Sequence, residues 1–131
     1  MHQLCVYSGE ELATYNFGSK HPFGPLRLSS FMQELGKESL TEKICLCKPQ
    51  IAERTVIESF HDRDYVKKVE RLSHFGLGML DQGDTPAFIG MFEAASYVVG
   101  SVLDAVAQIM NGVCQHAFVP IAGLHHARRH H

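Results

Sequence analysis

The chain has 131 residues, of which 45% are hydrophobic and 20% are charged, and its formal net charge is −2. That length suits a single domain with a sizeable core, and the near-neutral charge excludes a broad basic surface for nucleic acid or anionic membranes. The basic cluster formed by Arg128-Arg129 and His130-His131 is short. We therefore expect no direct nucleic-acid partner.

The sequence also argues against a signal peptide and against a membrane-spanning helix. The first residues, Met1-His2-Gln3, have neither the basic region nor the long apolar core of a signal peptide. The most apolar long stretch, residues 87–110, contains Glu93, Asp104 and Gln108, which argue against a membrane span. We therefore expect a cytoplasmic protein with no membrane partner.

The four cysteines, Cys5, Cys45, Cys47 and Cys114, lack a CxxC pair and the spacing of a zinc knuckle. Three of them lie in apolar runs, where a free thiol behaves as a small buried hydrophobic group. The pattern therefore predicts reduced core thiols of a cytosolic protein.

Strand and helix signals alternate from the N-terminus onward. Residues 4–7 are apolar and partly β-branched, which predicts a buried strand, and a polar, glycine-rich loop follows. Residues 21–27 hold two prolines around a glycine, and Pro25 suits the start of a helix that ends at Gly36. The residues expected on the buried side of that helix are Leu28, Phe31, Met32 and Leu35.

The middle of the chain continues this alternation. Residues 44–47 predict a second short strand, and residues 51–60 have a helical pattern. Asp62 suits the N-cap of a further helix from Arg63 to about Ser73. That helix has a narrow apolar stripe suited to packing on a sheet, formed by Tyr65, Val66, Val69 and Leu72.

The last third supplies a loop, a long helix and a strand. Residues 74–84 contain three glycines, which is typical of a surface segment that carries function. Asp84-Thr85-Pro86 predicts a helix start, and the helix continues to Asn111-Gly112. The apolar residues 117–122 then predict a buried strand that ends at Gly123. This alternation predicts an α/β fold with a parallel sheet.

Two adjacent histidines, His125 and His126, follow the expected C-terminal edge of that strand. Ligands and catalytic groups collect at this edge in open α/β sheets, and imidazole exchanges protons near neutral pH. Adjacent residues seldom chelate one ion well, so acid and base roles fit better than metal ligation. The alternative is a pair satisfied by local hydrogen bonds. Asp84 either caps a helix or has a functional role in its loop. Arg27 is either an ordinary solvent-exposed arginine at the start of a helix or a residue with a functional role.

Four segments, in this order, resemble the N-terminal part of the histone deacetylase superfamily, including bacterial deacetylase-like, acetylpolyamine amidohydrolase and acetoin-utilisation-type members. Residues 21–27 (HPFGPLR) resemble the HP-x-x-P-x-R segment of that family, and residues 60–66 (FHDRDYV) resemble its F-H-[ST]-x-[ED]-Y-[IV] junction. Residues 76–86 together with residues 90–95 resemble its D-[TC]-P…G-[MI]-[YF] stretch, and residues 122–127 (AGLHHA) resemble its G-G-[LW]-H-H-A. Each match alone is weak, but four at matching separations are specific.

The resemblance implies a role for individual residues. His126 would be the base that takes a proton from a zinc-bound water attacking an acetyl-lysine-type amide, with His125 as its electrostatic and acid partner. Asp84 would lie on the rim and bind the incoming substrate, and Gly123 would leave room for the acyl-lysine channel. Arg27 would line an internal cavity where the acetate product collects.

The sequence departs from the family pattern in two respects. Ala122 stands where the family usually has the first of two glycines. The zinc ligands of the family, two aspartates and a histidine, and its catalytic tyrosine lie further downstream, and no residue here matches them. The resemblance therefore implies zinc for the full-length family enzyme, whereas we nominate no metal ligand and expect no bound zinc in this chain.

The resemblance also implies a fold: the N-terminal portion of an arginase/deacetylase-like parallel sheet flanked by helices, with about three of eight strands present. We expect residues 1–131 to form a single partial domain, truncated after the His-His motif. Its exposed sheet edge invites pairing, so the chain is a fragment, is completed by another chain, or forms a homo-oligomer.

The first hypothesis for function is the N-terminal fragment of a zinc-dependent deacetylase-like amidohydrolase that acts on acetylated lysine or acetylated polyamines and is inactive alone. The second is a non-catalytic oligomerisation module with the same half-fold. The third is a different hydrolase of the related arginase-like fold.

Overall fold

A three-stranded parallel sheet forms the centre of the chain in a computed structural model that describes residues 2–124 and 127–131. Its strands, in the spatial order β2-β1-β3, are β1 (His2–Tyr7), β2 (Cys45–Cys47) and β3 (Cys114–Phe118). Cys5 in β1 is the register partner of Cys45 on one side and of Ala117 on the other. The predicted α/β class and the three parallel strands are confirmed.

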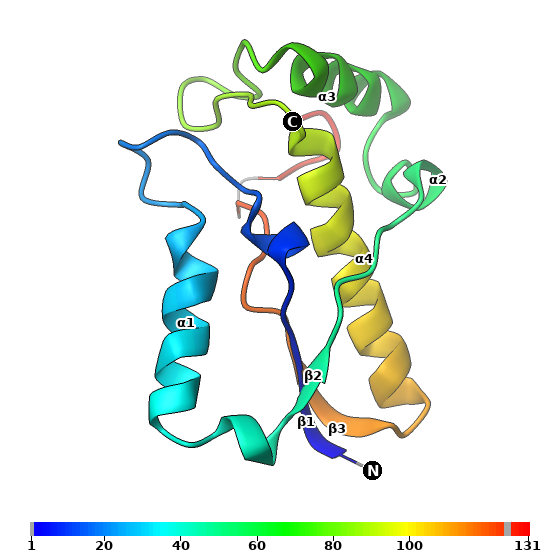
Figure 1. Cartoon of the computed structure of the whole chain (residues 1–131). Helices are drawn as coiled ribbons and strands as arrows, with labels where there is room; N and C mark the ends of the chain where they lie inside the picture. Colours follow the sequence, from blue (N-terminus) through cyan, green and yellow to red (C-terminus); the bar gives the residue numbers. More distant parts are fainter. Residues whose placement is uncertain (1, 125–126) are drawn as a thin grey trace.

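Helices flank this sheet on both sides. The helical elements are η1 (Glu10–Ala13), α1 (Leu26–Lys37), η2 (Thr41–Lys43), α2 (Arg54–Ile57), α3 (Arg63–Phe75) and α4 (Met91–Met110). Figure 1 shows α1 and α4 on opposite sides of the strands and α3 crossing near the N-terminal end of α4. None of the helices in the described ranges is long and apolar enough to cross a membrane.

The central strand β1 is locked to α4 through a buried tyrosine. Tyr7 is fully buried, and its hydroxyl donates a 2.5 Å hydrogen bond to Oδ2 of Asp104. Burial raises the pKa of the Tyr7 phenol, so the group stays neutral and keeps the proton that it donates. The same core contains Leu12, Leu28 and Val98, which come from η1, α1 and α4. Both helical layers therefore pack around one strand.

The long helix α4 also touches the chain that follows β2. The backbone N–H of Gln50 donates to Oγ of Ser101 (3.1 Å), and the N–H of Ala52 donates to the carbonyl oxygen of Ser96 (3.0 Å). A Cβ atom on Gly100 would lie 2.2 Å from the carbonyl oxygen of Gln50. Only a residue without a side chain permits this approach.

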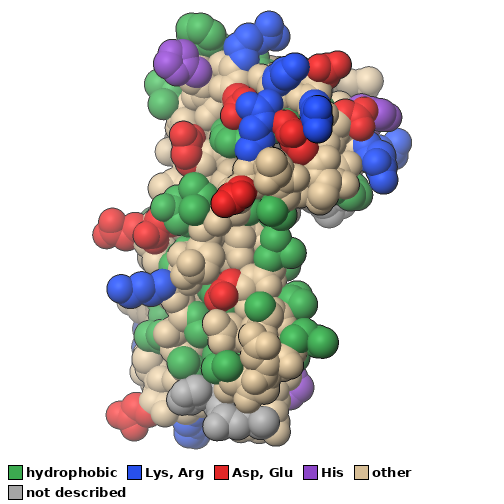
Figure 2. All heavy atoms as spheres, turned by 90° about the vertical axis from the view of Figure 1, so that its right-hand side faces the viewer, with side chains coloured by type: hydrophobic (Ala, Val, Ile, Leu, Met, Phe, Trp, Pro, Cys, Tyr) green, Lys and Arg blue, Asp and Glu red, His purple; other side chains and the backbone are tan. Residues whose placement is uncertain are grey.

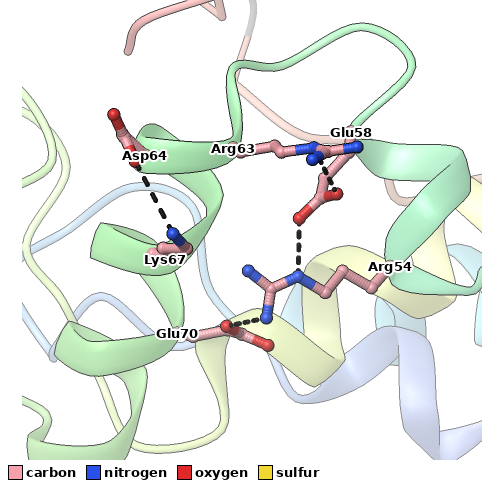
Figure 3. A network of polar contacts seen from close by, with 6 residues as sticks. All are labelled: Arg54, Glu58, Arg63, Asp64, Lys67 and Glu70. Atoms are coloured by element: carbon pink, nitrogen blue, oxygen red, sulfur yellow. Dashed lines mark hydrogen bonds and ion pairs between the residues drawn. The ribbon is translucent and has the colours of Figure 1, made fainter.

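A network of charged side chains joins α2 to α3 (Figure 3). Arg54 places Nε 2.6 Å from Oε1 of Glu58 and a terminal nitrogen 2.6 Å from Oε2 of Glu70. Arg63 lies 3.5 Å from the second oxygen of Glu58. Two carboxylates on one guanidinium restrict its geometry and link the two helices.

Three element boundaries differ from the sequence predictions. The long helix begins at Met91 rather than near Asp84, after Gly90 in a left-handed conformation (φ 82°). The preceding residues fold back instead: the N–H of Leu80 donates to Thr85 and the N–H of Ala87 donates to Gly78. Competition from this turn for the same backbone groups moves the helix start by about two turns, so the prediction that Asp84 caps the helix is wrong.

The third strand also lies earlier than predicted, at Cys114–Phe118 rather than 117–122. Its last register partner is Val6, and β1 ends one residue later. Residues 119–122 thus have no strand beside them in the described part of the chain, although Ile121 is buried. Within 51–60, only Arg54–Ile57 is α-helical. The helix α3 begins at Arg63 after Asp62, as predicted, although the Asp62 side chain makes no cap hydrogen bond.

We predict that Gly100→Ala destabilises the chain by about 3 kcal/mol, since its methyl group meets backbone atoms that cannot rotate away. Gly36→Ala is the matched control, because nothing lies within 4 Å of a Cβ at that helical position. It should stabilise by roughly 0.5–1 kcal/mol. Urea unfolding measures the change in unfolding free energy for each variant. Equal changes would contradict the close approach of α4 to the backbone of Gln50.

Candidate functional site

A cavity of about 260 Å³ lies between α3, α4, the loop 80–85 and the segment that follows β3. Apolar side chains from the two helices form most of its wall: Val66, Val69, Met91, Phe92, Ala95, Val98 and Val99. Residues with polar groups are fewer: Tyr15, His61, Tyr65, Asp81, Thr85 and His131. An apolar cavity with a few polar groups is the usual form of a small-molecule site.

The predicted site residues fall into three groups in this structure. Gly123 lines the cavity. Asp84 is exposed on the loop beside Thr85, and Arg27 is exposed with its guanidinium 5.1 Å from the centre of the Phe23 ring. His125 and His126 lie outside the described residues. In sequence they stand between Leu124 and Ala127, both of which line the cavity. The roles given to these five residues stay predictions.

His21 connects the proline-rich segment to the Asp84 loop. Its Nδ1 accepts the N–H of Phe23 at 3.1 Å, so in the neutral ring the proton is on Nε2. That nitrogen lies 3.0 Å from the carbonyl oxygen of Asp84 and donates to it. The ring of His21 also lies 4.7 Å from that of Phe17, between centroids. Two segments that carry the family resemblance are therefore joined by one imidazole.

Asp81 closes the same loop from inside. One carboxylate oxygen accepts the backbone N–H groups of Gly83 (3.0 Å), Asp84 (2.9 Å) and Thr85 (2.9 Å), and the other accepts the Thr85 hydroxyl (2.7 Å). The Thr85 hydroxyl and the backbone N–H groups hold the pKa of Asp81 well below its ordinary value. The carboxylate is thus charged at neutral pH and fixes the position of Asp84.

Aromatic rings cluster at one part of the cavity, where Tyr15 and Phe17 line its wall. Tyr15 has ring centroids of Phe17, Phe23 and Phe88 within 5.7, 5.7 and 5.9 Å of its own. Burial raises the pKa of Tyr15 to about 12, so it is a neutral phenol at physiological pH. Burial also raises the pKa of Tyr65 on the opposite wall. The cavity therefore offers two uncharged hydroxyl-bearing rings among apolar side chains.

The C-terminal segment is fixed to the start of α3. The His61 ring donates from Nδ1 to the carbonyl oxygen of Arg128 (2.7 Å), and the N–H of Asp62 donates to the carbonyl oxygen of Arg129 (2.9 Å). The carboxylate of Asp62 pairs with His130. Figure 1 shows the same return of the chain end toward α3. These bonds hold the stretch downstream of the two histidines against the cavity.

Sequence reasoning missed part of this site. It nominated neither His61 nor Asp81 as a site residue and placed Tyr65 only in the apolar stripe of its helix, yet all three line the cavity. The signal for His61 and Tyr65 was present, because both belong to the family-like segment 60–66. The signal for Asp81 was an aspartate two residues before Gly83, a spacing at which the side chain accepts backbone N–H bonds within a turn.

The residues described around the cavity do not assemble a zinc site. A group of three histidine, cysteine or carboxylate ligand atoms close enough to share one ion occurs once in the described ranges, at Cys5, Cys45 and Cys47. None of these cysteines lines the cavity. A catalytic zinc needs about three protein ligands with one open position, so the described cavity residues do not fit that metal.

Comparison with known proteins gives consistent matches. The histone deacetylase domain family matches residues 21–131. Acetoin utilization protein AcuC of Bacillus subtilis (strain 168) is 32% identical, over 96% of this chain and 34% of its own length. Histone deacetylase 9 of Arabidopsis thaliana is 28% identical, over 94% of this chain and 30% of its own.

A solved structure matches the fold along the whole length of this chain. The crystal structure of the HDA15 HD domain aligns with a TM-score of 0.86 and 19% sequence identity, covering 100% of this chain and 39% of that one. The chain therefore spans about a third of the length of the curated relatives that it matches.

We predict that Asp81→Asn destabilises the loop in a pH-dependent manner. Since the folded-state pKa lies below the ordinary 3.8, the stabilisation is fully present above about pH 5 and is lost as pH falls below 4. The difference in unfolding free energy between wild type and variant should shrink over that range. Asp84→Asn is the control, because its described hydrogen bonds use only main-chain atoms. A difference in unfolding free energy that does not depend on pH would contradict the role of the ionised Asp81 carboxylate in this loop.

Proposed function

Because the chain belongs to the histone deacetylase family, we propose that it forms the N-terminal third of a zinc-dependent deacetylase domain that acts on acetylated lysine or acetylated polyamines. The observation that carries this proposal is the cavity, whose wall includes Gly123, Leu124 and Ala127 on both sides of the His125-His126 pair. Its apolar wall suits the methylene chain of an acylated amine.

Within that domain the chain supplies the proton-transfer half of the site. His126 acts as the base toward the attacking water, and His125 is its electrostatic and acid partner. Asp84 binds the substrate at the rim, on a loop that Asp81 and His21 hold in place. Arg27 serves an internal cavity for the acetate product once the domain is complete. The zinc ligands come from outside this chain, so we assign no step through the metal here.

The proposal also requires a partner surface for the remaining two thirds of the domain. The strand β3 is an edge of the described sheet, and α4, which packs against it, exposes apolar side chains on its outer side. These residues, here named the α4 face, are Val102, Leu103, Val106, Ile109 and Met110. Figure 2 shows apolar side chains gathered over α4, with charged side chains gathered over α2 and α3. An apolar area beside an open strand edge suits the rest of the domain.

The activity test joins the chain to the downstream two thirds of AcuC, the part that the chain does not match. We expect the chain alone and the AcuC part alone to be inactive on an acetyl-lysine peptide, and the folded fusion to be active. In the fusion, His126→Ala should lower kcat/KM by at least about 100-fold, because it removes the general base. His74→Ala, an exposed histidine on α3, is the control and should leave kcat/KM unchanged.

Two outcomes contradict the proposal. Deacetylation by the 131-residue chain alone, abolished by a chelator, would show that its zinc site is already complete. A folded fusion that keeps full activity after His126→Ala would remove the base assignment. Circular dichroism and a thermal melt establish that the fusion is folded before either result is read.

A second candidate function, a non-catalytic oligomerisation module, is favoured by the same α4 face. In this case copies of the chain cover the open edge and the apolar side chains of one another. Val106 is 53% exposed, and Val106→Lys would place a charge inside such an interface. Leu26→Lys on α1, where Leu26 is 76% exposed, is the matched control on the opposite side of the sheet.

If the chain acts as this module, the isolated chain self-associates and Val106→Lys shifts it to monomer, whereas Leu26→Lys does not. Light scattering over a range of protein concentrations measures the molar mass. A monomer at every concentration would contradict the module and leave the deacetylase proposal intact. Equal effects of the two variants would contradict the α4 face as the interface.

A further inference from the structure

Three cysteine side chains converge on one face of the sheet, away from the cavity. Cys5 lies in the middle of β1, and Cys45 and Cys47 lie in the neighbouring strand β2. Cys5 and Cys45 are register partners, and residues two apart in a strand point to the same face. The three Sγ atoms all lie within 4.8 Å of one another. The fold thus brings Cys5 together with two thiols that lie 40 and 42 residues further along the chain.

This spacing is close to that of ligands around a single metal ion. Bonds of about 2.3 Å from a metal to three sulfur atoms place those atoms roughly 4 Å apart. Less than about an ångström of contraction would therefore bring the Sγ atoms to ligand distance. Side-chain rotation at Cys45 and Cys47 would supply such a movement, and both residues lie on β2, one of the two edge strands of the described sheet.

The cluster is both enclosed and accessible. Cys5 is fully buried in the central strand, whereas Cys45 and Cys47 are half-buried in the edge strand β2. An ion can therefore reach the two outer thiols from solvent and then contact the inner one. Leu46 between them points to the other face and is 50% exposed. The edge position provides the entry path that a binding site needs.

Metal binding at these thiols is an exchange of protons for the cation. Each S–H releases H⁺ to solvent as the metal–sulfur bond forms, with no change of oxidation state. The exchange therefore needs no oxidant or reductant.

We propose that Cys5, Cys45 and Cys47 form a three-coordinate site for a thiophilic monovalent cation of the Cu⁺ type. An all-sulfur set selects soft ions over calcium, magnesium or manganese. The number of sulfur atoms then decides between copper and zinc, since structural zinc takes four ligands. Cys114 in β3 lies beside Cys5 but outside the group of three mutually close Sγ atoms. A tetrahedral zinc site would need Cys114 as a fourth ligand, in addition to the three mutually close thiols.

The sequence pattern did not reveal this cluster because its ligands come from two strands. Cys45-Leu46-Cys47 has the C-x-C spacing that places both thiols on one face of a strand, but the third ligand is 40 residues away. The inference is independent of the proposed deacetylase function, because none of the three cysteines lines the cavity.

The test titrates the reduced 131-residue chain with Cu⁺ under anaerobic conditions, in competition with a chromogenic Cu⁺ chelator. We expect one equivalent to bind, with thiolate-to-copper absorption in the ultraviolet. Cys45→Ser and Cys47→Ser should each weaken binding by more than about 100-fold, beyond the loss typical of residues outside the coordination shell. Cys114→Ser is the matched control and should retain wild-type affinity. Cys5 is left unchanged because it is fully buried.

The remaining outcomes overturn the site. If the chain takes no Cu⁺ from the chelator, or if Cys45→Ser and Cys47→Ser both bind Cu⁺ as tightly as the wild type, these thiols have no ligand role. Binding of Zn²⁺ that is lost in Cys114→Ser would assign a four-sulfur zinc site in place of the three-coordinate one. Circular dichroism of each variant confirms that lost binding does not come from lost folding.

Discussion

The strand β1 imposes the constraint on which the rest of this structure depends. A parallel strand must be paired at its edges and covered on both faces, because its backbone groups and apolar side chains cannot be left exposed to water. In this chain β2 and β3 pair with β1, and α1 and α4 cover the two faces. The Tyr7 hydroxyl joins β1 to Asp104 of α4 at full burial, and Gly100 lets the same helix touch the chain after β2. The outer strands β2 and β3 each keep one unpaired edge within the described residues, and we propose that the rest of the domain attaches at β3.

The candidate site follows from the same arrangement. Because α4 is tied to β1, its N-terminal half stands beside the segment that follows β3, and α3 closes the space between them. Polar side chains position the parts of this enclosure, and two of them, Asp81 and His61, also line it. Asp81 shapes the loop, His21 ties that loop to the proline-rich segment, and Asp62 and His61 hold the C-terminal residues. The cavity is thus formed by family-like segments that are far apart in sequence, and this agreement supports a shared site more strongly than any single motif.

The sequence predicted those parts of the fold that depend on local patterns. The strand β1, the helix α3 with its start at Arg63, and the end of α4 before Asn111-Gly112 follow from apolar periodicity and turn residues. Features set by distant contacts were mispredicted or missed. The carbonyl oxygen of Thr85, which a helix starting at Asp84 would use as an acceptor, instead accepts the N–H of Leu80. The strand β3 is placed by its ladder with β1 rather than by its most apolar residues. The thiol cluster likewise needs the pairing of β1 with β2, which no spacing within one segment encodes.

The central claim is that this chain is one third of a deacetylase domain whose sheet continues beyond β3. Backbone hydrogen exchange across residues 114–118 tests it most directly, because half of the amides of an edge strand point away from their only partner. We predict fast exchange of those outward amides in the isolated chain, slow exchange of β1, and protection of both strands in the fusion with the downstream part of AcuC. Outward β3 amides that are already protected in a monomeric chain, or that stay unprotected in a folded and active fusion, would contradict the account.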